Sequence, residues 1–155
     1  MLIKLFQYNW MVRDEWFERC KQVPIEELLR NRMGGTGSIL YTLFHILDVE
    51  YSWIRGIQGE PDIQFQYENY KTLEQVKQLS DSWNKETKSF LDNWSDDLDS
   101  EKITVSWMEG HYAKGEIVRH LIAHEIHHMG QLSIWAREIG IQPVSANVID
   151  RGLFK

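Results

Sequence analysis

Four of the six histidines in this chain stand within one short segment, as His120, His124, His127 and His128. The apolar residues around them recur with helical spacing. Because residues four apart lie on the same face of an α-helix, His124 and His128 can direct two imidazole nitrogens toward one point. A helix binds a transition metal with that arrangement. The pair therefore predicts a metal site, with a third ligand elsewhere in the chain.

The third ligand is predicted to be His45. Its neighbours on both sides, Leu43-Phe44 and Ile46-Leu47, are apolar, so this turn is expected to be buried. A buried imidazole without a partner would cost about 1–3 kcal/mol. A lone histidine of this kind is usually a core residue whose nitrogens are hydrogen-bonded. Beside a histidine pair on another helix, it is predicted to be a metal ligand. Three neutral imidazoles leave positions open for water, as catalytic zinc sites do.

Other polar residues of the histidine segment are expected to lie outside the coordination sphere. His120, one helical turn earlier, is predicted to be a rim residue. His127 points about 100° away from His128 around the helix, and Glu125 lies beside the ligand face. Gln131 follows His128 by three residues, where it could hydrogen-bond a ligand or make an ordinary helix contact.

Polar residues near His45 have two interpretations as well. Asp48 and Glu50 could orient His45 through hydrogen bonds, but solvated surface is the simpler prediction for both. His111, in a predicted turn, is expected to be exposed.

The segment His124–His128 also satisfies His-Glu-x-x-His, the motif of zinc proteases in which the glutamate is the general base. In the longer form of that motif a glycine and a third histidine follow at fixed offsets. This chain has Gln131 at the glycine position and breaks the pattern downstream. Glu138 and Asp150 are poor candidates for a downstream ligand. A metal-dependent hydrolase is therefore the minor alternative.

The composition excludes several classes of partner. The chain has 155 residues, a formal net charge of −6 and a hydrophobic fraction of 43%. Without a basic stripe it is not expected to bind nucleic acid, and no apolar run is long enough to cross a membrane. The single cysteine, Cys20, can make no internal disulfide, which fits a reducing, cytoplasmic compartment. The length fits one domain, residues 1–155.

Four long helices are predicted to position the histidines. Thr36 or Ser38 could cap the second helix, and Thr72 with Gln75 makes a capping-box pattern before the third. Gly140 follows the last helix at a position that ends helices. The predicted helices cover residues 2–22, 39–57, 72–94 and 114–139, with a short helical turn at 25–29, an extended segment at 102–107 and a turn at 109–112.

These elements predict an all-α fold, a four-helix bundle with a short β-segment near 102–107. The connections 58–71 and 95–113 are long enough to cross the bundle, so simple up-down-up-down topology is not required. The C-terminal tail, residues 143–155, is expected to pack either on the bundle or on a partner.

Two segments resemble the DinB-like family of proteins. Residues 43–53, Leu-Phe-His-Ile-Leu-Asp-Val-Glu-Tyr-Ser-Trp, are similar to the second helix of that family. Residues 120–140, which begin His-Leu-Ile-Ala-His-Glu-Ile-His-His-Met, are similar to its last helix. The resemblance extends over essentially the whole chain in length and helix order. It implies a four-helix bundle, often homodimeric, with a divalent nickel or zinc ion between His45, His124 and His128.

The resemblance also implies an activity. A metal with open positions can lower the pKa of bound water, or it can bind and activate a thiolate. DinB-like relatives resemble, or are, thiol S-transferases, so the chain is expected to join a low-molecular-weight thiol to a small electrophile. Met129 stands where many members have an arginine, so no role of that arginine is carried over.

The substrate-binding residues and the competing function remain open at this stage. Three tryptophans could line an acceptor pocket, although the bundle core is their simpler role: Trp10, Trp53 and Trp135. Three arginines could bind the carboxylates of a thiol, although the helix surface is their simpler role: Arg55, Arg119 and Arg137. The competing interpretation is a non-catalytic metal-binding protein that acts in a stress response or binds a protein partner. Three ligands without a visible fourth favour catalysis, because structural zinc sites are closed.

Overall fold

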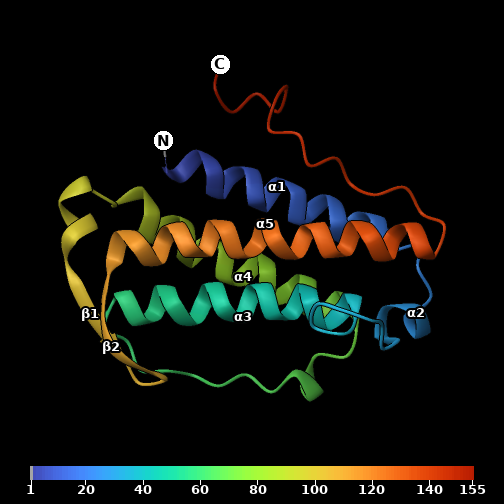
Figure 1. Cartoon of the computed structure of the whole chain (residues 1–155), viewed down its shortest axis with the longest axis horizontal. Coiled ribbons are helices and arrows are strands. Elements are labelled where there is room, and N and C mark those ends of the chain that lie inside the picture. The colour runs from blue at the N-terminus through green and yellow to red at the C-terminus, as the bar shows by residue number, and fades with distance from the viewer. Residues whose placement is uncertain (1) are drawn as a thin grey trace.

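Four long helices make up most of the computed structural model, which describes residues 2–155 (Figure 1). Each begins within one residue of its predicted start, but the first ends earlier, at Cys20, and the third ends at Asp92. The helical elements are α1 (Leu2–Cys20), α2 (Ile25–Leu29), α3 (Ile39–Ile57), α4 (Leu73–Asp92) and α5 (Lys114–Glu138), with the 3-10 turns η1 (Tyr67–Asn69) and η2 (Asp96–Ser100).

Side-chain caps fix where α3 and α4 begin. Ser38 is the N-cap of α3, and its side chain accepts a hydrogen bond from the backbone N–H of Tyr41. Thr72 and Gln75 form the predicted capping box of α4. These contacts satisfy backbone N–H groups that a first helical turn leaves without partners. Among the helices of residues 2–155, none is both long enough and apolar enough to span a membrane.

The bundle is closed, because α3 contacts α4 and α5, and α1 contacts both of them as well. Helices α1 and α5 run in one direction, and α3 and α4 run in the other (Figure 1). Residues 58–71 return along the length of the bundle and form the predicted crossover. Residues 95–113 do not cross the bundle. They stay at one end of it, because α5 begins at the end where α4 stops.

A small hairpin occupies this connection, with strands β1 (Lys102–Val105) and β2 (Met108–Ala113). The strands are antiparallel, and Ile103 pairs with Tyr112. The extended segment near 102–107 is confirmed, but the prediction of a turn at 109–112 was wrong. The turn is tighter and lies at Ser106-Trp107, and the following residues pair with β1, which satisfies their backbone groups. His111 is exposed, as expected, but lies on a strand.

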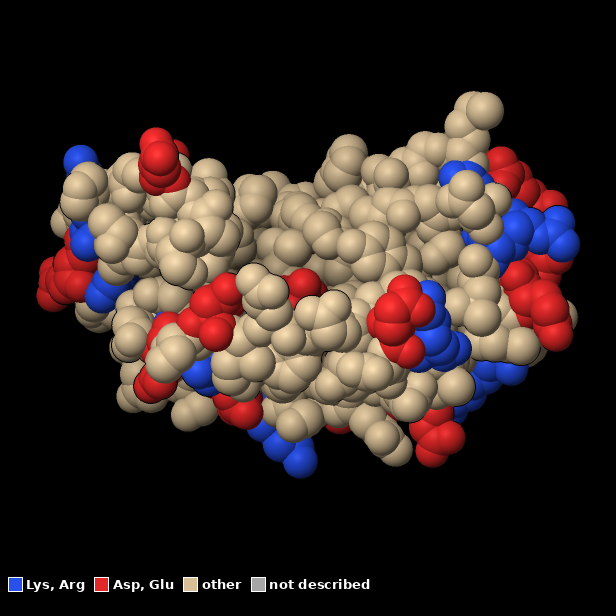
Figure 2. All heavy atoms as spheres, turned by 90° about the horizontal axis from the view of Figure 1, so that it is seen from below, with Lys and Arg blue, Asp and Glu red and all other residues tan. Residues whose placement is uncertain are grey.

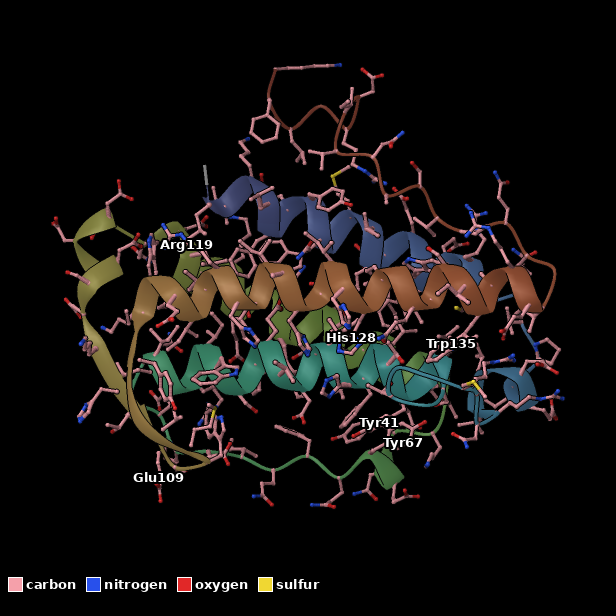
Figure 3. The ribbon with its side chains drawn as sticks, viewed as in Figure 1. Tyr41, Tyr67, Glu109, Arg119, His128 and Trp135 are labelled. Carbon is pink, nitrogen blue, oxygen red and sulfur yellow. The ribbon has the colours of Figure 1, made fainter. Side chains whose placement is uncertain are left out.

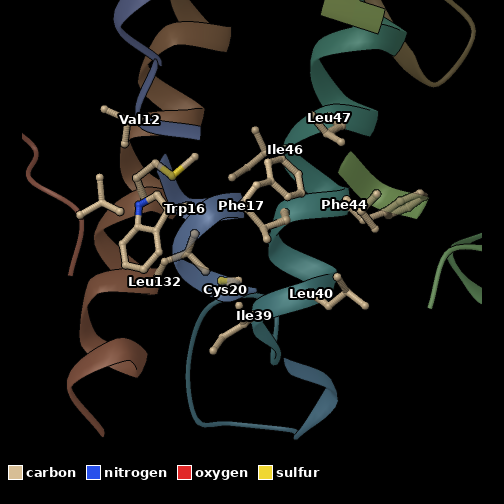
Figure 4. Packing of buried hydrophobic residues seen from close by; sticks show 14 of the residues in the cluster. Val12, Trp16, Phe17, Cys20, Ile39, Leu40, Phe44, Ile46, Leu47 and Leu132 are labelled. Carbon is tan, nitrogen blue, oxygen red and sulfur yellow. The ribbon is translucent and has the colours of Figure 1, made fainter. Parts of the chain in front are cut away.

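Two apolar clusters fill the bundle, one toward each end. The larger lies where α1 ends and α3 begins, and Figure 4 shows part of it: Val12, Trp16, Phe17, Cys20, Ile39, Leu40, Phe44, Ile46, Leu47 and Leu132. The smaller lies toward the hairpin and includes Phe6, Trp10, Ile54, Ile57, Leu91, Ile117, Val118, Leu121 and Ile122. Three buried charged residues interrupt these apolar surfaces, namely Arg13 on α1, Glu50 on α3 and Glu125 on α5.

The C-terminal tail packs on the bundle, along α1 (Figure 1). Tyr8 donates a hydrogen bond of 2.6 Å to the carbonyl of Ala146. Arg151 forms an ion pair of 2.6 Å with Glu15, and Val144 is buried. The tail was predicted to pack either on the bundle or on a partner, and the structure shows it on the bundle, against α1.

Candidate metal centre

Three histidines from two helices meet between α3 and α5. The Nε2 atom of His124 lies 3.1 Å from Nε2 of His45 and 3.1 Å from Nε2 of His128. All three potential ligand atoms lie within 4.8 Å of one another. His45 comes from α3 and the other two come from successive turns of α5, as their four-residue spacing predicts. Figure 3 marks this position at His128.

The spacing of these nitrogens fits a metal ion. A tetrahedral ion with metal–nitrogen bonds of about 2.0–2.1 Å holds two imidazole nitrogens about 3.3–3.4 Å apart. The observed separation of 3.1 Å differs from this by a few tenths of an ångström. Small side-chain rotations remove such a difference, so the three histidines could hold a metal ion.

The protonation state of the cluster also fits a metal ion. Burial, reinforced by the neighbouring His128, lowers the pKa of His45 to about 4. Burial and the surrounding histidines lower the pKa of His124 to about 3, and burial lowers the pKa of His128. The imidazoles of His45 and His124 are therefore neutral at pH 7, which is the form that binds metal.

Gln131 fixes the orientation of His128. Its Oε1 lies 2.7 Å from Nδ1 of His128, and its Nε2 lies 3.2 Å from Nε2 of His127. An amide oxygen can only accept, so Nδ1 of His128 carries the proton and Nε2 presents its lone pair to the other histidines. A hydrogen bond of this kind selects the tautomer of a metal ligand. Of the two roles predicted for Gln131, the structure shows the hydrogen bond, made to the candidate ligand His128.

A glycine-rich loop packs closely against Gln131. Gly35 has a positive φ of 52°, and a Cβ atom placed on it would lie 2.5 Å from Oε1 of Gln131. In the same loop, the carbonyl of Met33 accepts a hydrogen bond of 3.3 Å from the indole of Trp135. The absence of a side chain at position 35 is therefore what lets the loop approach the residue that orients His128.

On the side of α5 that faces away from the histidines, Arg13 links this helix to the bundle core through Glu125. Its guanidinium contacts Glu125 at 2.7 Å and 2.6 Å and Glu50 at 2.9 Å, and all three side chains are buried. Although burial opposes its charge, the two carboxylates hold the pKa of Arg13 above its ordinary value. Burial also raises the pKa of Glu125. The ion pairs join α1, α3 and α5 at one level of the bundle.

These contacts correct one expectation from the sequence and explain another. Glu50 is not solvated surface, because it is 5% exposed and paired with Arg13. Glu125 is 1% exposed and both of its oxygens face Arg13, so it does not occupy the place of a general base beside the metal. The His-Glu-x-x-His segment therefore lacks the feature on which the protease interpretation depends.

The remaining candidates lie around the site or away from it. His120 is exposed on the rim, with its ring centroid 5.7 Å from that of His124. Met129 is buried in the core. Trp10 and Trp135 are buried in the core as well, whereas Trp53 is half-buried and faces the hairpin. The predicted arginines make local contacts: Arg55 with the Pro61 carbonyl, Arg119 with Asp99, and Arg137 with the Ser133 carbonyl.

Sequence reasoning missed the role of Arg13 and the contact of Gly35. A signal for the first existed: Arg13 follows Val12 and precedes Trp16 on an amphipathic helix, while Glu50 follows an apolar stretch. Charged residues at such positions are buried only in pairs. The pairing itself joins segments far apart in sequence, so it could not be read from either segment alone.

Comparisons with known proteins agree with this fold. A sequence model of the DinB family matches residues 1–151. The chain is 54% identical over 153 residues to "Uncharacterized protein YizA" of Bacillus subtilis (strain 168), covering 98% of this chain and 96% of that protein. Crystal structures of the DinB-like protein YjoA from Bacillus subtilis and of a DinB-like protein from Bacillus cereus ATCC 10987 superpose with TM-scores of 0.67 and 0.69, each at 15% identity. The matches cover 93% and 94% of this chain, and 94% and 95% of those chains.

Proposed function

We propose that this chain, which belongs to the DinB family, binds one divalent nickel or zinc ion through His45, His124 and His128 and transfers a low-molecular-weight thiol to a small electrophile. The observation that carries the proposal is the convergence of three neutral imidazole nitrogens from two helices. Within residues 2–155, no fourth imidazole, thiol or carboxylate joins this cluster. Three ligands with an open position are typical of catalytic sites.

The reaction is a substitution without net oxidation. The thiol loses its proton to solvent, its sulfur forms a bond to the electrophilic carbon, and the leaving group departs with its bonding electrons. A bound divalent ion would supply Lewis-acid stabilisation of the thiolate at neutral pH. The protein's residues keep the ligand nitrogens neutral, and Gln131 holds His128 with its lone pair toward the site.

The reacting thiol must come from a second molecule. Cys20 is the only cysteine of the chain, and burial raises the pKa of its thiol to about 12. A buried thiol with so high a pKa supplies almost no thiolate at neutral pH. This excludes the chain's own sulfur as the nucleophile and supports a small thiol as co-substrate.

The first experiment measures metal content. Tag-free wild type, His45→Ala, His124→Ala and the control His111→Ala are purified in parallel, and nickel and zinc per chain are determined by mass spectrometry. His111 is exposed on β2 and outside the cluster, so its variant should retain the wild-type content. The two ligand variants should lose the metal. Metal-free wild type, or full retention in His45→Ala, would overturn the proposed site.

The second experiment measures thiol transfer with metal-loaded protein. Cysteine or glutathione is mixed with 1-chloro-2,4-dinitrobenzene, and the thioether is followed by its absorbance. Wild type should accelerate the reaction, and His45→Ala should not. If loaded wild type is inactive with both thiols and with further electrophiles, the non-catalytic metal-binding alternative is favoured.

A further inference from the structure

A cavity of about 340 Å³ lies between α3, the 58–71 crossover and the tip of the hairpin. Its lining includes Asp48 and Trp53 from α3, Asp62 and Phe65 from the crossover, and Trp107 from the hairpin turn. The volume is in the range of small-molecule sites, and the mixture of aromatic walls with a few polar groups is typical of them. The cavity therefore has the size and composition of a ligand site.

The cavity adjoins the candidate metal centre along one face of α3. Asp48 and Ser52 follow His45 by three and seven residues, so all three lie on the same side of the helix. The rise of the helix separates them by about 5–10 Å. On α5, the ring of His120 lies 6.5 Å from Trp53 and 5.7 Å from His124, measured between centroids. A small molecule in this cavity would thus lie next to the histidines.

The charge of the cavity has one sign. Asp48 and Asp62 are its charged residues, and no lysine or arginine lines it. Among residues 2–155 neither carboxylate forms an ion pair. Burial, reinforced by Asp62, raises the pKa of Asp48 to about 6. Figure 2 views this side of the bundle and shows several carboxylates on it, with Lys and Arg side chains beside some of them.

The aromatic walls complement a cation. The rings of Trp53 and Trp107 meet edge to face with centroids 5.1 Å apart, and Phe65 comes from the opposite wall. Tryptophan faces attract organic cations within about 6 Å. A hard metal ion such as Ca²⁺ instead requires six to eight oxygen ligands, which two carboxylates among aromatic rings do not supply.

We propose that this cavity binds a small molecule through an organic ammonium group, with Asp48 and Asp62 as counter-charges and Trp53 and Trp107 as walls. The role of the bound molecule as a substrate rests on the proposed function. Its binding in the cavity does not. One of the two substrates at the metal centre would then carry a positive charge. The three arginines that the sequence suggested for the carboxylates of a thiol make local contacts instead.

Choline and 3,3-dimethylbutan-1-ol test the inference, because they have nearly the same shape and differ in charge. A quaternary nitrogen cannot coordinate a metal, so binding reports on the cavity alone. Titration calorimetry is carried out on metal-free and zinc-loaded wild type, Asp62→Asn, Trp107→Leu and the control Asp97→Asn. Asp97 is exposed and lies in η2, away from the cavity. Circular dichroism and metal content are recorded for every sample.

Choline should bind wild type about tenfold more tightly than the neutral alcohol. Asp62→Asn and Trp107→Leu should each weaken choline binding by a factor on the order of ten, while Asp97→Asn should leave it unchanged. Equal affinity for the alcohol, no response to Asp62→Asn in folded protein, or displacement of choline by Ca²⁺ would overturn the inference. If wild type binds choline but takes up neither zinc nor nickel on loading, the proposed function fails and this inference stands.

Discussion

The Nδ1 atom of His128 and the Oε1 atom of Gln131 lie 2.7 Å apart, one turn along α5. This contact decides which nitrogen of His128 carries the proton, and therefore which one is available to a metal. The same amide contacts His127 through its nitrogen, so its orientation is fixed from both ends. A residue outside the histidine cluster thus fixes the orientation of one of its members.

Replacing Gln131 by alanine should weaken metal binding by about 10- to 100-fold, because His128 loses the partner that holds its ring and tautomer. The affinity is measured by competition with a chromogenic chelator. His127→Ala is the matched control, since it removes the other partner of Gln131 and leaves the contact with His128 in place. Equal affinities in wild type and Gln131→Ala would show that the hydrogen bond has no part in metal binding.

Gly35→Ala should weaken metal binding, whereas Gly34→Ala should not. Both glycines have positive φ values, of 52° and 83°, so each substitution should cost about 1–2 kcal/mol of stability. Only at Gly35 would the new Cβ meet the amide of Gln131, while nothing lies within 4 Å at Gly34. Thermal unfolding and chelator competition separate the two effects. Identical metal affinities in the two variants would contradict the prediction.

Arg13→Met should destabilise the protein by about 3–5 kcal/mol at pH 7, because it leaves the carboxylates of Glu50 and Glu125 buried without a counter-charge. Protonation relieves that cost, so the deficit relative to wild type should shrink as the pH falls toward 5. Urea unfolding at several pH values measures it. Arg137→Met, at an exposed arginine, should change stability by less than about 0.5 kcal/mol. A deficit that does not depend on pH would argue against unpaired carboxylates as its cause.

Asp48→Asn should stabilise the metal-free protein at pH 7.5 by about 1 kcal/mol, allowing for the partial exposure of the side chain. The folded-state pKa of Asp48, about 6, lies above its ordinary value of 3.8. Its ionised form is therefore disfavoured by folding above pH 6, and this cost is lost as the pH falls from 6 to about 3.8. The gain should vanish near pH 4 in denaturant titrations. A gain that persists at pH 4 would show that charge is not its source.

Much of the fold follows from local patterns in the sequence. The starts of α3 and α4 are set by Ser38 and Thr72, whose side chains cap backbone groups a few residues away. The four-residue spacing of His124 and His128 places them on one face of α5. His45 was assigned to the same site from its apolar surroundings and from the family resemblance, and the structure brings it to the pair.

Other features depend on which helices become neighbours. The partnership of Arg13 with Glu50 and Glu125 spans separations of 37 and 112 residues, and each charge alone suggests solvent. The cavity beside His45 exists because the crossover returns along α3 and the hairpin tip folds over its end. Sequence by itself determined that His124 and His128 share one face of a helix and which helices carry the candidate histidines, because these features depend on spacing within a turn or two. Only the tertiary structure decided which charges are paired and where a cavity remains, because these depend on contacts between segments far apart in the chain.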